Sequence, residues 1–296
     1  MRTMKLGIVA ATLLITAAGL AACGEAGSSD EGAKVDAKSD CDGKFAAGSR
    51  MEELSKAGTI KVGVKYDQPG LGFKGAADKV PAGFDIEIAK LLVADLCIDP
   101  SSTKVSWVET ISDNREPFLE AGKVDVVLAT YSITDDRRKV VGQAGPYMIT
   151  GQQILVKSDS KVAGVADLQG KEVCSVTGST SLTNVSKAGA KGVGTGSYSE
   201  CAEKVLDGTY PAMTTDGSIL AGLAAQNEGE LKVVGEAFSE ERIGIGYAKD
   251  RTEMCQWING VLTTSFEDGS WEEAFKLTLG PSGVDTPEKP TLDQCQ

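Results

Sequence analysis

Residues 124–138 read VDVVLATYSITDDRR, and this stretch carries most of the information about the fold. Its first six residues are apolar apart from one aspartate, which predicts a buried strand. Polar residues 130–132 follow, and Thr134 is placed to cap a helix that begins with two aspartates. Open α/β sheets bind ligands at the carboxyl ends of their parallel strands. The stretch therefore predicts an α/β protein with a ligand site at this strand end.

Arg137 lies in the first turn of the predicted helix, where a cation opposes the helix dipole. This local cost suggests that its guanidinium group is needed as a bidentate clamp for a carboxylate. The alternative is an ion pair with Asp135, Asp136 or a carboxylate of the C-terminal tail. The sequence does not decide between the two interpretations.

Outward from this stretch, short strands alternate with helices. Strands are predicted before it at residues 59–65 and 104–109, with helices at 84–96 and 114–121, and the pattern pauses after it at 145–151. The later predicted strands are residues 152–157, 172–176, 210–214, 231–234 and 243–248, and the later helices follow Gly178 or cover residues 200–206, 217–226, 252–266 and 270–279. Such alternation predicts largely parallel sheets covered by helices, here as two units that enclose a cleft.

Two later stretches repeat the order of strand, polar residues and helix. Residues 173–182 (VCSVTGSTSL) place Ser179 and Thr180 at a helix N-terminus, where backbone N–H groups and hydroxyls can bind an anion. An ordinary helix cap is the alternative. Residues 210–220 (YPAMTTDGSIL) place Asp216 at a helix start, where it either caps the helix or pairs with an ammonium group across a cleft.

Composition excludes several function classes. The chain has 42 acidic and 30 basic residues, and its net charge of −12 argues against nucleic acid as a partner. It has no histidine, which excludes Ser-His-Asp and Cys-His catalysis and histidine-bound metals. Residues 192–196 read GVGTG with no Lys-Ser or Lys-Thr after them, so we interpret them as a flexible surface loop, not a phosphate site. We expect no cofactor and no metal.

The N-terminus has the order of a secretory signal peptide over residues 1–22. Two basic residues precede an uncharged apolar run, which is shorter than the roughly 20 residues of a transmembrane helix. The run ends in LAAC at Cys23, which resembles the bacterial lipobox and implies cleavage before Cys23 and lipid attachment to it. Residues 24–40 are small, polar and charged, which predicts a disordered tether. We therefore expect a protein held by lipid at the outer face of the cytoplasmic membrane.

Taken together, residues 124–138 and the DLQGKEVCSVTGSTS and PAMTTDGSIL segments resemble the family-3 extracellular solute-binding proteins, which bind polar amino acids for ABC importers. The pattern is most similar to the glutamate-binding lipoproteins of actinobacterial importers. The resemblance implies the two-lobed type II periplasmic-binding-protein fold. Lobe 1 would contain residues 41–147 and 244–296, and lobe 2 residues 148–243. We expect a monomer that closes its lobes on an amino acid and presents it to ABC permease subunits.

The resemblance also assigns residues to the ligand α-carboxylate. Arg137 corresponds to the arginine that clamps this group, and Ser132 to a position whose hydroxyl contacts it. Thr180, with Ser179 beside it, corresponds to the helix N-terminal position that donates its backbone N–H to the same carboxylate.

Other positions would hold the rest of the ligand. Asp216 corresponds to the aspartate that pairs with the α-ammonium group, and Thr130 to a position whose carbonyl accepts from it. Lys65 departs from relatives with glutamine or basic ligands, which often carry an acidic residue and an aromatic platform after the first strand. A cation there favours a ligand with a second carboxylate, and Arg115 is another candidate for this role; an ordinary exposed lysine is the alternative. The prediction is an acidic amino acid, glutamate or aspartate.

Six cysteines remain besides Cys23, and an even number in an exported chain predicts three disulfides. The residues alone leave their connectivity open. The fold implied by the resemblance suggests the pairs Cys41–Cys97, Cys174–Cys201 and Cys255–Cys295.

Two other function classes use the same fold. A ligand sensor would use the same site and signal to a different partner. An exported dehydratase would need an acid in the cleft, for which Asp216 is a candidate. We expect a binding protein and not an enzyme.

Overall fold

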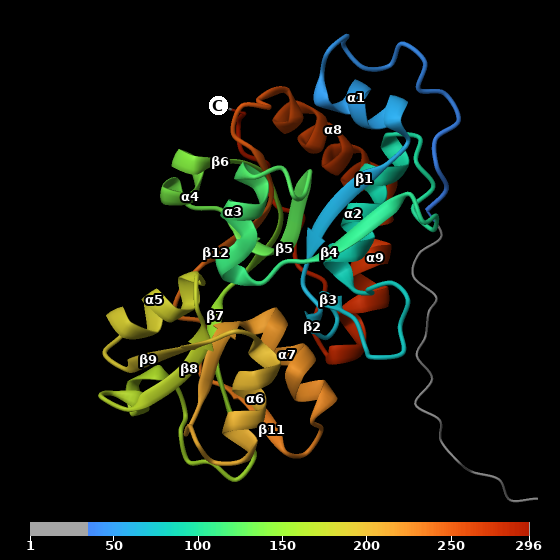
Figure 1. Ribbon diagram of the computed structural model, residues 1–296. Helices are drawn as coiled ribbons and strands as arrows, with labels where there is room; N and C mark the ends of the chain where they lie inside the picture. Colours follow the sequence, from blue (N-terminus) through green and yellow to red (C-terminus); the bar gives the residue numbers. More distant parts are fainter. Residues whose placement is uncertain (1–34, 296) are drawn as a thin grey trace, which may run out of the picture. The chain divides into compact units, whose positions relative to one another are not determined.

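The computed structural model describes residues 35–295, which form two five-stranded sheets and one two-stranded sheet (Figure 1). The predicted signal peptide, Cys23 and residues 24–34 of the predicted tether lie outside the described residues. No helix within the described residues is long and apolar enough to span a bilayer. We call the first five-stranded sheet with its helices lobe 1 and the second with its helices lobe 2.

The sheet of lobe 1 has the strand order β4-β1-β5-β12-β6. β1 (Ile60–Val64) pairs in parallel with β4 (Val105–Glu109) and β5 (Val126–Ser132). β12 (Glu241–Ala248) runs antiparallel to β5 and to β6 (Val141–Thr150). The sheet is mixed, and not largely parallel as predicted, because the chain leaves the lobe along β6 and returns beside it along β12.

Helices cover both faces of this sheet, and β5 shows the consequence. Its Val126 and Leu128 join the apolar cluster around α2 (Phe84–Asp95), whereas Val127 and Tyr131 join a separate cluster on the opposite face. The strand is buried on both sides, as its sequence predicts. The other helices of lobe 1 are α1 (Arg50–Ala57), α3 (Arg115–Glu120), α4 (Asp135–Val140), α8 (Glu253–Asp268) and α9 (Ser270–Thr278).

The sheet of lobe 2 has the strand order β11-β7-β10-β8-β9. β8 (Glu172–Val176) pairs in parallel with β10 (Met213–Asp216) and β9 (Lys191–Thr195). β7 (Gln152–Lys157) runs antiparallel to β10 and to β11 (Leu231–Val234). The remaining elements are α5 (Thr180–Lys187), α6 (Tyr198–Leu206) and α7 (Gly217–Gln226) in lobe 2, the short pair β2 (Asp67–Gln68) and β3 (Gly72–Phe73), and 3-10 turns at Ser112–Asn114, Val165–Leu168 and Gly280–Ser282.

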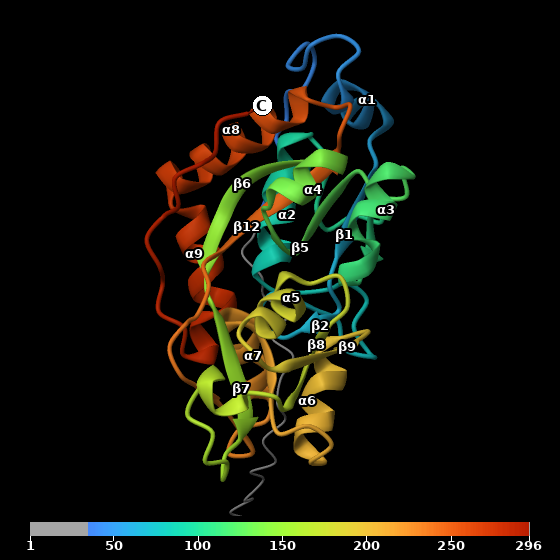
Figure 2. The ribbon, with the colours of Figure 1, turned by 90° about the vertical axis from the view of Figure 1, so that its left-hand side faces the viewer.

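Two chain segments connect the lobes. The chain passes from β6 through Gly151 into β7, and it returns through residues 235–240 into β12 (Figure 2). The segments touch at Gly151, where a Cβ would lie 2.5 Å from the Cβ of Ala237. The predicted lobe boundaries, 147/148 and 243/244, fall inside β6 and β12 and stay a proposal.

Two segments differ from the prediction. An interruption of the strand and helix pattern is predicted at residues 145–151, but β6 covers this segment as far as Thr150. Gly145 and Pro146 resemble a turn in sequence, although the strand around them is buried. Residues 192–196, interpreted as a loop, contribute most of β9. A Cβ at Gly194 would lie 2.5 Å from Thr177 Oγ1, so the glycines here allow close approach to neighbouring residues and do not mark a flexible loop.

Disulfides and polar contacts fix the first and last described segments to lobe 1. The three disulfides of the described residues are the pairs that the resemblance implied: Cys41–Cys97, Cys174–Cys201 and Cys255–Cys295. Lys38, in the predicted tether, donates its backbone N–H to Ala94 O at 3.0 Å, and its Nζ lies 2.5 Å from Asp95. The last residues of the predicted tether are therefore attached to the end of α2, where the helix dipole and Asp95 favour a cation.

Candidate functional site

Thr130, at the end of β5, has a left-handed backbone with φ of 44°. Asp85 of α2 holds it there, because Asp85 Oδ2 accepts from the backbone N–H of Thr130 at 2.8 Å and lies 2.9 Å from its Oγ1. Tyr147 donates its hydroxyl to the other oxygen of Asp85 at 2.6 Å. Burial raises the pKa of Asp85 to about 6, and these hydrogen bonds oppose the rise. The strand end is therefore positioned by a residue that the sequence did not single out.

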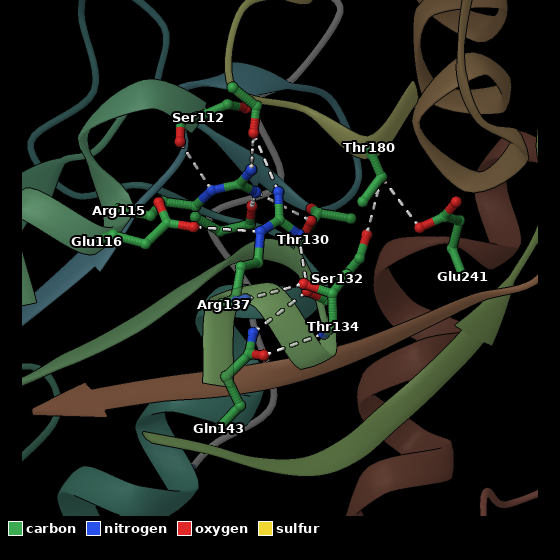
Figure 3. A network of polar contacts seen from close by, with 12 residues as sticks. Ser112, Arg115, Glu116, Thr130, Ser132, Thr134, Arg137, Gln143, Thr180 and Glu241 are labelled. Atoms are coloured by element: carbon green, nitrogen blue, oxygen red, sulfur yellow. Dashed lines mark hydrogen bonds and ion pairs between the residues drawn. The ribbon is translucent and has the colours of Figure 1, made fainter. Parts of the chain in front are cut away.

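Arg137 follows the predicted cap, since Thr134 Oγ1 accepts from its backbone N–H at 3.2 Å. Its guanidinium group donates to Ser132 O at 2.7 Å and, across the lobes, to Gly178 O at 3.0 Å. Its Nε pairs with Glu116 at 3.2 Å (Figure 3). Two branches of the guanidinium group are thus held by lobe 1, and the third reaches lobe 2.

The ion-pair alternatives that the sequence left open for Arg137 are not what the structure contains. Its carboxylate partner is Glu116, not Asp135 or Asp136. The tail carboxylate of Asp293 pairs instead with Arg138, at 2.5 Å. Adjacent arginines therefore have different partners: one faces lobe 2 and the other binds the C-terminal tail.

Arg115 is 3% exposed and donates to Ser112 O at 3.1 Å and Ala129 O at 3.2 Å. Its Nη2 reaches Gly178 O at 3.1 Å, so Arg115 and Arg137 share one carbonyl of lobe 2. Burial, and then the charge of Arg137, lower the pKa of Arg115 to about 10. Two guanidinium groups therefore converge on a single uncharged acceptor.

Lys65 is 1% exposed, which contradicts the alternative of an ordinary surface lysine. Its Nζ donates to Ser112 Oγ at 2.9 Å and lies 5.7 Å from the centre of the Tyr198 ring in lobe 2. Burial lowers the pKa of Lys65 to about 8, with Asp67 opposing the change and Arg115 adding to it. Ser112 contacts both Lys65 and Arg115, so these two candidate residues lie together.

Ser179 and Thr180 take different roles at the start of α5. Ser179 is the cap, because its Oγ accepts from the backbone N–H of Leu182 at 3.1 Å. Thr180 Oγ1 lies 3.3 Å from Ser132 Oγ of lobe 1 and donates to Glu241 Oε2 at 3.0 Å (Figure 3). Ser132 and Thr180, predicted to contact the same carboxylate, are thus brought together across the lobes.

Asp216 ends β10 and stands at the N-cap position of α7, yet its side chain makes no cap hydrogen bond within the described residues. It is 3% exposed, and its Oδ1 has no hydrogen-bond partner among residues 35–295. Burial, and then the nearby charge of Glu241, raise the pKa of Asp216 to about 8. A buried acceptor without a donor is costly, so this carboxyl group is complementary to a cation.

Several residues that build this site were missed in the sequence. Glu116 adjoins Arg115, Asp85 lies in the first turn of α2, and Glu241 begins β12. Asp85 carries a weak local signal, since it stands between the apolar residues Phe84 and Ile86, and a buried carboxylate requires partners. Gly178 contributes a carbonyl group, which no side-chain pattern can indicate.

The fold and this site define a class of protein. Residues 60–279 match the family described as bacterial extracellular solute-binding proteins, family 3. The chain belongs to this family, and it has the family's two-lobed α/β fold. The structures that it resembles include that of the ancestral amino acid-binding protein AncCDT-1, a precursor of cyclohexadienyl dehydratase, with a TM-score of 0.70, 31% identity, and coverage of 78% of this chain and 100% of that one.

Similar curated proteins bind amino acids. Glutamate-binding protein GluB of Corynebacterium efficiens is 39% identical over 234 residues, which are 75% of this chain and 79% of GluB. ABC transporter glutamine-binding protein GlnH of Bacillus subtilis is 33% identical over 260 residues, or 87% of this chain and 90% of GlnH. Both relatives are named for the amino acid that they bind.

Proposed function

We propose that this chain is the substrate-binding protein of an ABC importer and that it binds an acidic amino acid, glutamate or aspartate, between its lobes. The observation that carries the proposal is the burial of Lys65 and Arg115, neither of which forms an ion pair within the described residues. A buried cation without a counter-ion costs several kcal/mol. A ligand with two carboxylates would offset that cost.

The α-carboxylate would bind where Arg115 and Arg137 converge. The carbonyl of Gly178 that they share offers only a partial charge, whereas a carboxylate offers a full charge and the bidentate geometry that guanidinium groups prefer. The N-terminus of α5 and the hydroxyls of Ser132 and Thr180 add donors beside this point. Both lobes contribute, so binding would favour the closed arrangement.

The α-ammonium group would pair with Asp216, whose Oδ1 has no donor among the described residues. The second carboxylate would reach Lys65, which Ser112 and the Tyr198 ring hold in place. A basic side chain would meet Lys65 and be repelled. This division of charges favours glutamate and aspartate over glutamine, and arginine least.

Calorimetric titration with glutamate, aspartate, glutamine and arginine tests the proposal. We expect the two acidic ligands to bind at least tenfold more tightly than glutamine. Arg137→Ala should remove binding, and Arg138→Ala is the matched control, since Arg138 binds the tail carboxylate Asp293 instead of facing the cleft. Preference for arginine, or wild-type affinity in Arg137→Ala, would refute it.

We also propose that lipid on Cys23 holds the protein beside its permease. The LAAC sequence that ends at Cys23 supports this. Expression of the full chain with Cys23→Ser should release protein to the medium and abolish labelling by a radioactive fatty acid. Unchanged labelling would refute the lipid site.

The similarity to AncCDT-1 gives one reason to consider a dehydratase. Asp216, with its pKa raised to about 8, would then be the proton donor in the cleft. Incubation of the purified protein with prephenate or arogenate decides this point. We expect no product to form.

A further inference from the structure

Tyr131 lies directly beneath the two arginines of the cleft. Its side chain is fully buried, and the Cζ atoms of Arg115 and Arg137 lie over its ring, 4.5 and 4.7 Å from the ring centre. Both distances are within the range in which a guanidinium group is attracted to an aromatic face. One ring therefore contacts both groups that would bind the ligand carboxylate.

The two guanidinium groups need such a contact because they repel each other. The charge of Arg137 contributes to the lowered pKa of Arg115, and the acceptors of Arg115 are backbone carbonyls. Within the described residues, Glu116 is the one carboxylate that forms an ion pair with either arginine, and its partner is Arg137. The negative face of an aromatic ring attracts both cations without neutralising either, so they remain available to an anion.

The surrounding chain leaves space for this ring. Gly246 of β12 faces it, since a Cβ at that position would lie 3.0 Å from Tyr131 Cε1, and β12 has an irregular register between Gly244 and Gly246. Buried apolar residues, Val127 and Val141 among them, belong to the same cluster as Tyr131. The ring has no freedom to move away from the arginines.

The hydroxyl group is not what this position requires. Tyr131 Oη is buried and makes no hydrogen bond of good geometry within residues 35–295, although burial and the nearby carboxylate of Glu116 raise its pKa. An unpartnered buried hydroxyl is unfavourable, so its removal should cost little. The contact that matters is between the ring face and the two cations.

We propose that Tyr131 is a positioning residue, which holds Arg115 and Arg137 side by side on one aromatic ring and so sets the affinity of the cleft for carboxylates. The proposal rests on the proposed function for the roles of the two arginines in ligand binding. It adds a residue that would not contact the ligand itself.

Titration of three variants with glutamate tests this role. Tyr131→Leu removes the ring, and we expect glutamate to bind about tenfold more weakly. Tyr131→Phe keeps the ring and should restore wild-type affinity. Val124→Ala, in the same apolar cluster but before the start of β5, is the control: it should lower the unfolding temperature without changing affinity. Equal affinity in Tyr131→Leu and the wild type would overturn the proposal, and so would equal losses in Tyr131→Leu and Tyr131→Phe.

A second measurement does not depend on the ligand. Phenylglyoxal modifies arginines, and mass spectrometry of the peptides reports Arg115 and Arg137 separately. We expect slow modification of both in the free wild type, Tyr131→Phe and Val124→Ala, and faster modification in Tyr131→Leu. If the wild type binds no amino acid but this difference appears, the proposed function fails and the role of Tyr131 stands. If reactivity is equal in all four proteins, the role of Tyr131 is refuted.

Discussion

Asp85 in lobe 1 and Asp216 in lobe 2 are both buried aspartates, but their carboxyl groups have different surroundings. Asp85 is held by Thr130 and Tyr147, whereas Asp216 Oδ1 has no donor within the described residues. Burial raises the pKa of both. It reaches about 6 for Asp85, whose hydrogen bonds oppose the change, and about 8 for Asp216, where Glu241 adds to it.

The difference separates a carboxyl group whose partners belong to the fold from one that we propose as a partner of the ligand. The donors of Asp85 belong to the fold, and they keep Thr130 in its left-handed conformation at the end of β5. Asp216 stands at a similar strand end, but its donor must come from elsewhere. Substitution of the first should therefore change stability, and substitution of the second should change binding.

Asp216→Asn should have a much larger effect on binding than Asp85→Asn. We expect glutamate affinity to fall at least a hundredfold, about 3–5 kcal/mol, because the ligand ammonium group loses its anion. The free protein should unfold at the same or a higher temperature, since a buried unpartnered carboxyl group is gone. Calorimetry and thermal unfolding measure the two quantities. Wild-type affinity in this variant would remove Asp216 from the site.

Asp85→Asn should have the opposite pattern. An amide cannot accept from Thr130 and Tyr147 on both sides, so we expect the free energy of unfolding to fall by about 2 kcal/mol. Affinity should fall less than in Asp216→Asn. Glu87→Gln on the same helix is the control, since Glu87 is buried but pairs with Lys90 alone. If Asp85→Asn lost glutamate binding while its free energy of unfolding stayed unchanged, the structural role assigned to Asp85 would be wrong.

Local patterns in the sequence predicted the elements that frame these residues. The bounds of α7, Gly217–Gln226, and the Thr134 cap of α4 follow from neighbouring residues and agree with the structure. The buried strand β5 is also as predicted, although it extends to Ser132. Such features depend on residues within a few positions of one another.

Features set by distant contacts could not be predicted in this way. The contact between Arg137 and Glu116 spans 21 residues, and that between Thr180 and Glu241 spans 61. Lys65 lies beside the Tyr198 ring of lobe 2, a contact between distant residues that no strand pattern indicates. β9 was missed because its glycines are required by the packing of neighbouring residues against it.

The two aspartates also predict how the stability of the free protein depends on pH. Their ordinary pKa is 3.8, and the folded values are about 6 and about 8. Between these limits the two aspartates bind more protons in the folded state than in the unfolded state, so their contribution to stability falls as pH rises from about 4 to about 8. Below pH of about 6 both aspartates contribute to this slope, and above it only Asp216 does. Asp216→Asn should therefore remove its contribution across the whole range, and Asp85→Asn only a contribution below pH of about 6. Unfolding temperatures of the wild type and both variants across this range measure the effect, and an unchanged slope in Asp216→Asn would contradict it.

Glutamate binding should have the reverse dependence below pH of about 8. The ammonium group needs an ionised Asp216, so affinity should rise by up to tenfold per pH unit as its pKa is approached. Above that point Lys65, whose pKa burial lowers to about 8, loses its charge and affinity for glutamate should fall. The affinity for glutamine should not fall when Lys65 loses its charge. Titrations of both ligands at several pH values provide the test, and identical profiles would argue against Lys65 as the partner of a second carboxylate.

Lys65→Met should have the smallest effect, and it distinguishes the ligand side chain from the ligand backbone. The substitution keeps length and apolar surface but removes a buried charge, so we expect about fivefold weaker glutamate binding and unchanged glutamine binding. Lys61→Met, an exposed lysine of the same strand, is the control and should change neither. Asp216→Asn weakens every amino acid, because all carry the ammonium group, whereas Lys65→Met should weaken only those with a second carboxylate. If glutamine binding falls as much as glutamate binding, Lys65 acts on the shared part of the ligand, and the proposed preference for acidic amino acids loses its main support.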